Sequence, residues 1–348
     1  MKKLFTLLAA FALFVTTSFA QRNLYYWGKN GDVSIEPASQ VDSLTFSVGS
    51  WLYKISKPVS LGATTNSFQG STKVAMSDKV KSIDVTPEVG ICYSDVNKTP
   101  TYEDAKQKLG SSMSDYSFTI KKDIDGGTTY YYRTYVKLLD EVYYSAVNSI
   151  TTMGEKPKVI NGHKFIDLGL PSGLLWAKTN VGASSSLDDG DYFAWGETEP
   201  KSFYSWSTYK WGGSPSKYNY RDGKTILDAE DDAATINWGE GCRMPSREEF
   251  VELLNKCDWS WQSDYNGSGV RGYLVTGSNG NFIFIPASGY RYGSVLNSRG
   301  SSGNYWSSSL NSSNTNDAYH LNFSSGSIAP SDYDGRYYGY PVRPVAEK

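Results

Sequence analysis

The apolar residues of this chain fall mostly in short runs, separated by clusters of Gly, Asn, Asp and Pro. Within residues 51–153 the runs have the length and composition of β-strands. The candidate strands are residues 82–85, 89–93, 116–120, 129–138 and 142–150. Short strands at nearly regular spacing predict a β-sandwich over 51–153.

The first twenty residues have the pattern of a signal peptide. Lys2 and Lys3 precede an apolar run over 4–15, and Ser18-Phe19-Ala20 provides the small-x-small spacing of a cleavage site. The run is shorter than the roughly 20 residues of a membrane-spanning helix. We therefore expect an exported chain, extracellular, on the cell surface or in the periplasm, with no membrane-spanning segment after cleavage.

Length, charge and composition divide the rest of the chain. At 348 residues the chain predicts more than one domain. Residues 21–50 alternate polar and apolar positions and predict a strand-rich lead-in. Residues 154–160 form a polar linker containing Pro157, and beyond it the composition shifts towards Gly, Trp and Ser. The net charge is −2 without blocks of like charge, which argues against nucleic acid as a partner.

Three motifs in the predicted sandwich resemble bacterial fibronectin-type-III-like modules. They are Val-Gly-Ile-Cys-Tyr-Ser at 89–94, Gly-Thr-Thr-Tyr-Tyr-Tyr-Arg-Thr-Tyr at 127–135 and Ser-Ile-Thr-Thr at 149–152. The resemblance implies an Ig/fibronectin-like sandwich that serves as a spacer or stalk.

Residues 161–348 predict one clear helix among short strands and long loops. Ser246 and Glu249 form a capping box, and Phe250, Leu253 and Leu254 then make an apolar stripe. The apolar run 282–286 predicts a buried strand that ends at a proline.

Motifs spread over the same region resemble the Fibrobacter succinogenes major paralogous domain family, which is C-type-lectin-like. They include Asp-Leu-Gly-Leu-Pro-Ser-Gly at 167–173, Gly-Asp-Tyr-Phe-Ala-Trp-Gly-Glu at 190–197, Arg-Met-Pro-Ser at 243–246, Pro-Ala-Ser-Gly-Tyr-Arg at 286–291 and Val-Arg-Pro-Val at 342–345. The resemblance implies an α+β domain over 161–348. Its expected scaffold residues are Trp176, Trp195, Arg243, Pro245, Trp306, Arg336 and Arg343, with Arg336 and Arg343 bound to carboxylates or backbone carbonyls inside the fold.

The C-type-lectin-like scaffold is shared with formylglycine-generating enzymes, which need a closely spaced cysteine pair late in the domain. Residues 258–348 contain no cysteine, and neither histidine has the spacing of a metal site. His320 alternates with Leu321 in a predicted strand, so we expect it to be a surface contact rather than a catalytic base. The chain is therefore not expected to be an enzyme.

Cysteines and acidic residues leave two alternatives open. Cys242 and Cys257 could form a disulfide, although a helix between them would hold them apart, and Cys92 is expected to be a buried apolar residue. Two acidic groups are predicted to be solvated turns, with a structural calcium ion as the alternative. They are Asp188–Asp191 with Glu197, and Asp228–Asp232. No cofactor or metal is otherwise expected.

Residues 288–340 are rich in Ser, Asn, Tyr and Asp, the residue types of antibody loops. The segment also resembles the variable region of C-type-lectin-like proteins diversified by retroelements. The resemblance implies exposed ligand-binding positions at Tyr292, Asn297, Asn304, Asn311, Asn314, Asn316, Asp317, Tyr319, His320, Asn322, Asp332, Tyr333, Asp334, Tyr337, Tyr338 and Tyr340.

The leading hypothesis is a non-catalytic recognition or adhesion protein that binds a protein or glycan ligand through the 288–340 surface. The alternative is a structural or assembly component of the cell envelope, in which the aromatic residues serve packing. Related copies that differ mainly within 288–340 would favour recognition, and uniform copies would favour structure.

Overall fold

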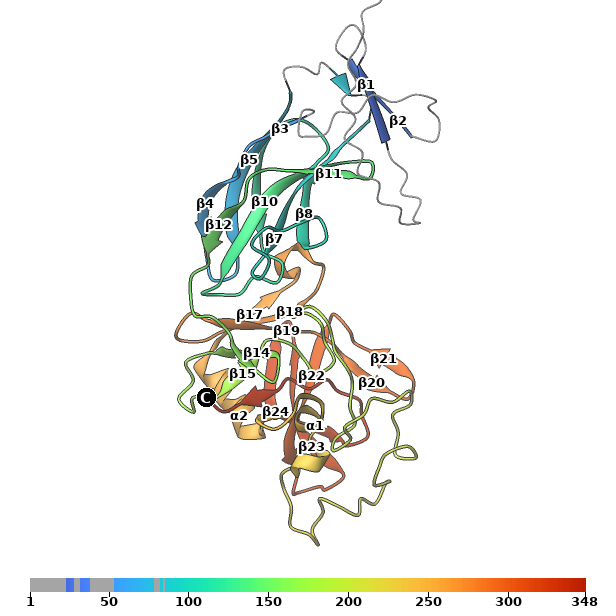
Figure 1. The fold of residues 1–348 in the computed structure, drawn as a ribbon. Helices are drawn as coiled ribbons and strands as arrows, with labels where there is room; N and C mark the ends of the chain where they lie inside the picture. Colours follow the sequence, from blue (N-terminus) through green and yellow to red (C-terminus); the bar gives the residue numbers. More distant parts are fainter. Residues whose placement is uncertain (1–22, 28–31, 38–52, 78–81, 84) are drawn as a thin grey trace, which may run out of the picture. The chain divides into compact units, whose positions relative to one another are not determined.

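The computed structural model describes residues 23–27, 32–37, 53–77, 82–83 and 85–348 (Figure 1). The predicted signal peptide and residues 38–50 of the predicted lead-in lie outside these residues. The chain divides into two compact units. The first comprises residues 1–59, 71–117 and 131–148, and the second comprises 60–70, 118–130 and 149–348.

The lead-in contains two described strands, β1 (Asn23–Trp27) and β2 (Asp32–Pro37), which pair as an antiparallel hairpin. The short strand β6 (Ser82–Ile83) lies parallel to β2 at the predicted position 82–85.

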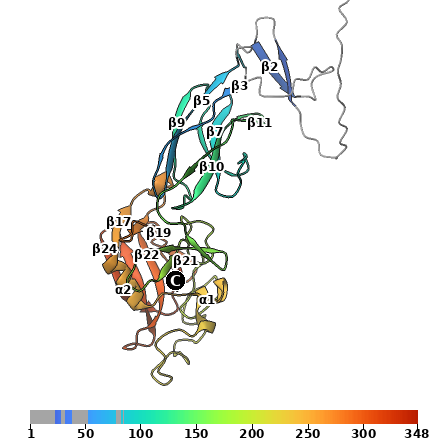
Figure 2. The ribbon, with the colours of Figure 1, turned by 60° about the vertical axis from the view of Figure 1, so that its left-hand side comes forward.

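Most of the remaining strands before residue 153 form two sheets (Figure 2). One sheet has the order β11 (Glu141–Tyr144), β10 (Thr129–Leu138), β7 (Glu88–Ser94) and β8 (Ala105–Gly110), with β12 (Asn148–Thr151) also paired to β10. The other has the order β3 (Tyr53–Ile55), β5 (Phe68–Met76) and β4 (Val59–Ala63), with β9 (Asp115–Ile120) also paired to β5.

The core of the first unit draws on both sheets. Tyr53 and Val74 come from β3 and β5, and they pack with Val89, Val136 and Leu138 from β7 and β10. Inward-facing apolar residues from two sheets make a β-sandwich. The predicted sandwich and its strands at 89–93, 116–120 and 129–138 are confirmed. The single strand predicted over 142–150 is two strands, because residues 145–147 leave the sheet.

The second unit holds four small sheets and two α-helices. The largest sheet has the order β13 (Lys158–Ile160), β14 (His163–Asp167), β15 (Leu175–Ala177), β25 (Val345–Ala346) and β16 (Cys242–Arg243). The others are β17 (Asp258–Gln262) with β18 (Gly272–Thr276) and β19 (Phe282–Pro286), β20 (Tyr290–Tyr292) with β21 (Val295–Asn297), and β22 (Ser302–Leu310) with β23 (Asp317–Ser324) and β24 (Ser327–Gly335). Residues 158–160 of the predicted linker form β13, which pairs with β14 in this sheet.

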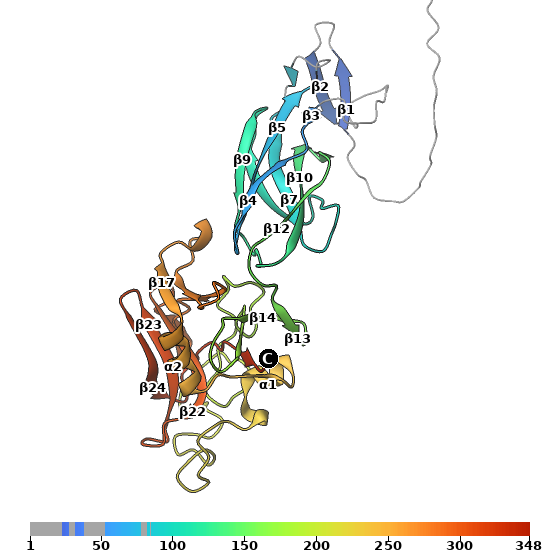
Figure 3. The same ribbon diagram turned by 90° about the vertical axis from the view of Figure 1, so that its left-hand side faces the viewer.

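The helix α2 (Arg247–Lys256) begins at the predicted capping box. The Ser246 side chain accepts from the Glu249 amide, and the Glu249 side chain accepts from the Ser246 amide. Phe250 and Leu253 are buried against the core, with the Phe250 ring 5.4 Å from Trp176. The helix lies against the β22–β23–β24 sheet (Figure 3). The other helix, α1 (Ala233–Trp238), is capped by the Asp232 carboxylate.

Arg343 holds the C-terminal segment inside the second unit. Its side chain is fully buried and donates to Asn180 Oδ1 and to the carbonyls of Ala177, Lys178 and Phe284. Burial lowers the pKa of Arg343 to about 10, so it still carries a charge at neutral pH. Arg243, by contrast, is partly exposed and pairs with Glu249 and Glu347.

All three cysteines are free, so the alternative of a Cys242–Cys257 disulfide is not realised. Cys92 is buried in the first unit, as expected. In the described part of the chain, no helix is both long and apolar enough to cross a membrane.

Candidate binding surface

An aromatic surface gathers side chains from three separate segments of the second unit. Phe203 and Tyr292 are exposed by 47% and 53%, while Trp206, Tyr337 and Tyr338 are half-buried. Tyr337 stacks on Tyr338 with ring centroids 4.5 Å apart, and Tyr292 lies 5.5 Å from Tyr338. Trp206 lies 4.8 Å from Tyr337 on another side. We call these five residues the tyrosine patch.

Backbone pairing brings the three segments together. Tyr204 and Gly293 exchange two hydrogen bonds of 2.8 and 2.9 Å, which fixes the loop carrying Phe203 and Trp206 to the β20–β21 hairpin. Arg291 and Gly339 exchange a second pair, which fixes the same hairpin to the segment that carries Tyr337 and Tyr338. The patch is therefore built on paired backbone rather than on free loops.

Buried tyrosines anchor the loop from beneath. The Tyr204 hydroxyl donates to the Tyr192 carbonyl at 2.6 Å, and the Tyr209 hydroxyl donates to the Trp195 carbonyl at 2.8 Å. Burial raises the pKa of both hydroxyls, so both stay protonated and remain donors.

The patch continues inward as a ladder of rings. Tyr338 lies 6.0 Å from Tyr340, and Tyr340 stacks on Trp306 at 4.2 Å. The Tyr340 hydroxyl donates to Asp334, and the Trp306 indole donates to the Phe193 carbonyl. Burial, with Tyr337 and Asp334 adding to it, raises the pKa of Tyr338, so its hydroxyl is neutral.

Four positions expected to be exposed are buried, and these predictions are wrong. Asn304, Asn311, His320 and Tyr340 have relative exposures of 4%, 4%, 2% and 1%. Asn304 Oδ1 accepts from the Asn322 side-chain amide at 2.7 Å, and Asn311 Oδ1 accepts from the backbone amide of Ser313. Composition suggested contact residues, but all four side chains fill space inside the fold, and the two asparagines also form hydrogen bonds there.

The prediction that His320 lies on the surface is wrong because both faces of β23 are covered by protein. His320 lies 5.7 Å from the Trp306 ring and 4.9 Å from the Tyr340 ring. Its Nδ1 has no hydrogen-bond partner among the described residues. Asp332 Oδ2 lies 4.0 Å from Nε2, but burial dominates and lowers the pKa of His320 to about 3, so the imidazole is neutral.

The remaining candidates do not all join the tyrosine patch. Tyr319 and Tyr333 face one another across β23 and β24 at 6.3 Å, and the Arg247 guanidinium lies over the Tyr319 ring. Asn314 and Asn316 lie in the turn before β23, and the Asn314 side-chain amide donates to Asp317, the first residue of that strand. The exposed candidates are Tyr292, Asn314, Asn316, Asp332 and Tyr333, and the half-buried ones are Asn297, Asp317, Tyr319, Asn322, Asp334, Tyr337 and Tyr338.

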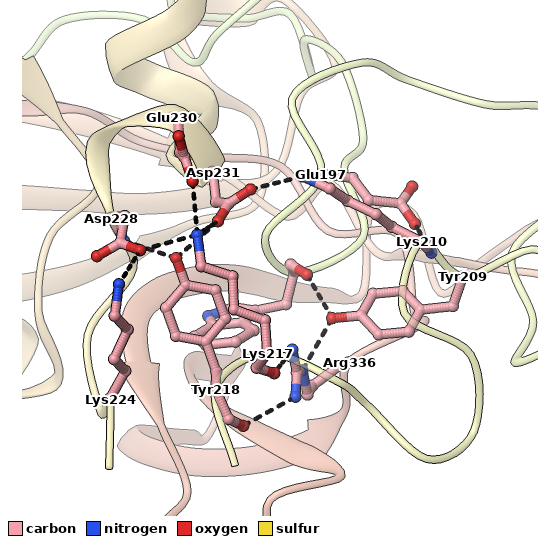
Figure 4. A network of polar contacts seen from close by, with 11 residues as sticks. Glu197, Tyr209, Lys210, Lys217, Tyr218, Lys224, Asp228, Glu230, Asp231 and Arg336 are labelled. Carbon is pink, nitrogen blue, oxygen red and sulfur yellow. Dashed lines mark hydrogen bonds and ion pairs between the residues drawn. The ribbon is translucent and has the colours of Figure 1, made fainter. Parts of the chain in front are cut away.

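Arg336 lies buried beneath this region in a cage of aromatic rings (Figure 4). Its guanidinium lies 4.7 Å from the Trp195 ring and 5.1 Å from the Trp211 ring. It donates to the Tyr209 hydroxyl and to the carbonyls of Lys217, Tyr218 and Thr315, but to no carboxylate. Burial lowers the pKa of Arg336, and the surrounding acceptors offset part of that cost.

A lysine occupies the centre of the neighbouring acidic group. Carboxylate oxygens of Asp228, Glu230 and Asp231 lie within 4.8 Å of one another, close enough to share a cation. The Lys217 ammonium lies 2.8, 2.7 and 2.5 Å from them (Figure 4). In the other acidic group, Asp189 pairs with Arg299, Glu197 pairs with Lys201, and Asp188 accepts from Ser184. Most of the carboxylates considered for calcium thus already have partners within the fold.

Phe203 and Trp206 were not among the contact residues predicted from the sequence. The sequence did contain a signal for an aromatic surface here, because five of residues 203–211 are Phe, Tyr or Trp. What the sequence does not show is the pairing of Tyr204 with Gly293, which places this loop beside residues almost ninety positions later.

Comparisons with known proteins do not identify a family for this chain. No protein-family model matches the chain, and no curated protein sequence matches it. Weakly similar solved structures include the sensor domain of the anti-sigma factor RsgI4 of Pseudobacteroides cellulosolvens, at 18% identity over 31% of this chain and 96% of that chain, with a TM-score of 0.22. The fibronectin type-III domain of human fibronectin type III domain containing protein 3 matches at 16% identity over 31% of this chain and 93% of that chain, with a TM-score of 0.22.

A third solved structure, the twitchin kinase region of C. elegans, is 10% identical over 65% of this chain and 31% of that chain, with a TM-score of 0.20. At TM-scores this low the matches support no conclusion about family or function. The class that the structure itself defines is a mostly β chain with few helices, which includes a β-sandwich.

Proposed function

We propose that this chain is an exported, non-catalytic recognition protein that binds a protein or glycan ligand through the tyrosine patch. The observation that carries the proposal is the stack of Tyr292, Tyr337 and Tyr338 on a buried aromatic ladder. Rings that are partly exposed yet held by core packing lose little entropy when a ligand binds.

The energetic logic is that of a binding hot spot. An aromatic side chain that becomes buried removes about 150–250 Å² from water, which makes such residues the usual anchors of interfaces. Polar side chains on the hairpin that carries Tyr292, such as Asn297, are available beside the patch. These side chains suit adaptable hydrogen bonds at the rim.

The proposal includes the domain identities implied by the two resemblances. Residues 161–348 would be a C-type-lectin-like domain, and 51–153 a fibronectin-type-III-like spacer. Two observations support the first identity. The C-terminal strand β25 pairs with β15 near the start of the domain, and the motif residues Trp176, Trp195 and Trp306 are all fully buried.

We also propose diversification by a retroelement, now limited to the candidate positions of 288–340 that are not buried. Diversified copies should differ at exposed positions such as Tyr292 and Tyr333. They should keep Asn304, His320 and Tyr340, because these side chains are buried. Variation spread equally over both sets would contradict diversification of a binding surface.

The experiment that identifies the ligand class is a glycan and surface-protein array probed with the full chain. Saturable binding to one class of ligand supports recognition. Silence across the array contradicts the proposal and leaves the structural alternative, in which the exposed rings pack against neighbouring components of the cell envelope.

A further inference from the structure

A cavity of about 370 Å³ lies within the second unit, and none of its lining residues belongs to the tyrosine patch. Its walls come from the turn at 265–268, from β19 and from the segments 121–126 and 186–187. Segment 121–126 belongs to this unit because 118–130 packs with it. The volume lies within the range of small-molecule sites, roughly 300–1,000 Å³.

One wall of the cavity is aromatic and apolar. The rings of Tyr265 and Phe284 stack at 4.0 Å with an angle of 4° between their planes, and both residues are buried. Burial raises the pKa of Tyr265 to about 12. Ile124, Leu187 and Ile283 extend the apolar wall.

The charged groups of the cavity compensate one another. Asp125 is buried and pairs with Lys164 and Lys178, and these two ammonium groups outweigh the effect of burial and hold the pKa of Asp125 below its usual value. The exposed charged residues of the lining are Lys121, Lys122, Asp123 and Glu155, two of each sign. Nothing in this arrangement favours a ligand of either charge.

Two hydroxyls of the lining are unused. Neither Ser186 nor Thr65 forms a side-chain hydrogen bond to any described residue, although Ser186 is only 8% exposed. A ligand can therefore gain a few hydrogen bonds here. A sugar would have to leave most of its hydroxyls unpaired against an apolar wall, at about 1–3 kcal/mol for each.

We propose that this cavity binds a neutral, planar aromatic molecule that carries one or two hydrogen-bonding groups. The ring packs beside the Tyr265–Phe284 stack, and a hydroxyl or amide of the ligand meets Ser186 or Thr65. This site is independent of the proposed recognition function, because it shares no residue with the tyrosine patch.

The test uses saturation-transfer NMR and calorimetry on the full chain with p-cresol as the probe. A ligand of this size should bind with a Kd on the order of millimolar. Benzoate and benzylamine, which carry a charge, should bind at least about tenfold more weakly because a charged group would lose water against the apolar wall. Binding of methyl glucoside in preference to p-cresol, or binding of none of the four, would overturn the proposal.

Two variants locate the site. Leu187→Trp fills the cavity and should abolish p-cresol binding, while Ser186→Ala removes one hydroxyl and should weaken it by about three- to tenfold. Tyr333→Ala, which lies elsewhere, should leave p-cresol binding unchanged. If Leu187→Trp is poorly folded by circular dichroism, Ser186→Ala decides alone. Unchanged affinity in that variant would place the probe elsewhere and contradict the assignment.

Discussion

The ring of Tyr340 stacks on Trp306 with centroids 4.2 Å apart, at the inner end of the ladder that begins at the surface with Tyr292. The tyrosines of 288–340 are therefore not equivalent. Tyr340 has 1% exposure and supports the patch from within, whereas Tyr292 at 53% is available to a ligand. Replacing the inner ring should affect folding, and replacing the outer ring should affect binding.

His320→Leu should reduce the loss of stability in acid. The folded-state pKa of His320 is about 3, and an unfolded histidine titrates near 6.5. The neutral form therefore stabilises the fold above about pH 6.5, and this contribution is lost as the pH falls towards 3. Wild type should lose about 2 kcal/mol between pH 7 and pH 5 from this residue alone.

Urea unfolding of wild type and His320→Leu at pH 7 and pH 5 measures how much stability each protein loses. Both proteins contain His163, so its contribution cancels in the comparison. Equal losses in wild type and in His320→Leu would show that His320 is not held neutral by burial.

Arg336→Met should lower the free energy of unfolding by about 3–5 kcal/mol. The change leaves the carbonyls of Lys217, Tyr218 and Thr315 without a donor in a buried site. Arg336→Lys should recover only part of the loss, because an ammonium cannot match the planar fork of a guanidinium. Urea midpoints of the three proteins provide the measurement, and a loss below about 1 kcal/mol for Arg336→Met would contradict this role.

Lys217→Met should lower the free energy of unfolding by about 1–3 kcal/mol and create a response to calcium. The change removes an ammonium that Asp228, Glu230 and Asp231 share, and the Asp231 side chain is only 3% exposed. Calcium should then raise the melting temperature of the variant more than that of wild type.

The matched control is Lys224→Met, because Lys224 is half-exposed and pairs with Asp228 alone. It should cost less than about 1 kcal/mol and gain no calcium response. The same response to calcium in all three proteins would rule out Lys217 as the internal substitute for a cation.

Ser246→Ala should lower the free energy of unfolding by about 1 kcal/mol, the usual value of an N-cap. The change removes the acceptor of the Glu249 amide at the first turn of α2. Ser263→Ala, at an exposed position in the same unit, should change stability by less than about 0.5 kcal/mol. The comparison is made by thermal unfolding, and equal effects would count against the cap.

Local patterns predicted local structure well. The capping box at Ser246 and the apolar stripe at Phe250 predict α2 because they depend only on residues three or four positions apart. The strands β7, β10 and β19 follow from β-rich composition and flanking turn residues in the same way. No turn residues in the sequence indicated that 142–150 would divide into two strands.

Exposure in 288–340 could not be predicted from residue type. Asn304 and Asn322 are the same residue type, yet Asn304 is buried and Asn322 is half-buried. Their exposure differs because the segments that cover β22 and β23 come from distant parts of the chain. The contribution of Phe203 and Trp206 was missed for the same reason. Long-range backbone pairing, as between Tyr204 and Gly293, decides which aromatic residues share a surface.

The central claim is tested most directly by comparing ligand binding of wild type with that of a Tyr292→Ala, Tyr337→Ala, Tyr338→Ala variant. The ligand is the strongest one found on the array, and Tyr220→Ala, which changes a tyrosine with 80% exposure outside the patch, is the control. The triple variant should stay folded but have a lower urea midpoint than wild type, because Tyr337 and Tyr338 are half-buried and pack against core residues. It should lose at least about 2 kcal/mol of binding free energy, roughly 30-fold in Kd, while the control binds as wild type does. Equal affinity in all three proteins would contradict the claim that the tyrosine patch recognises the ligand.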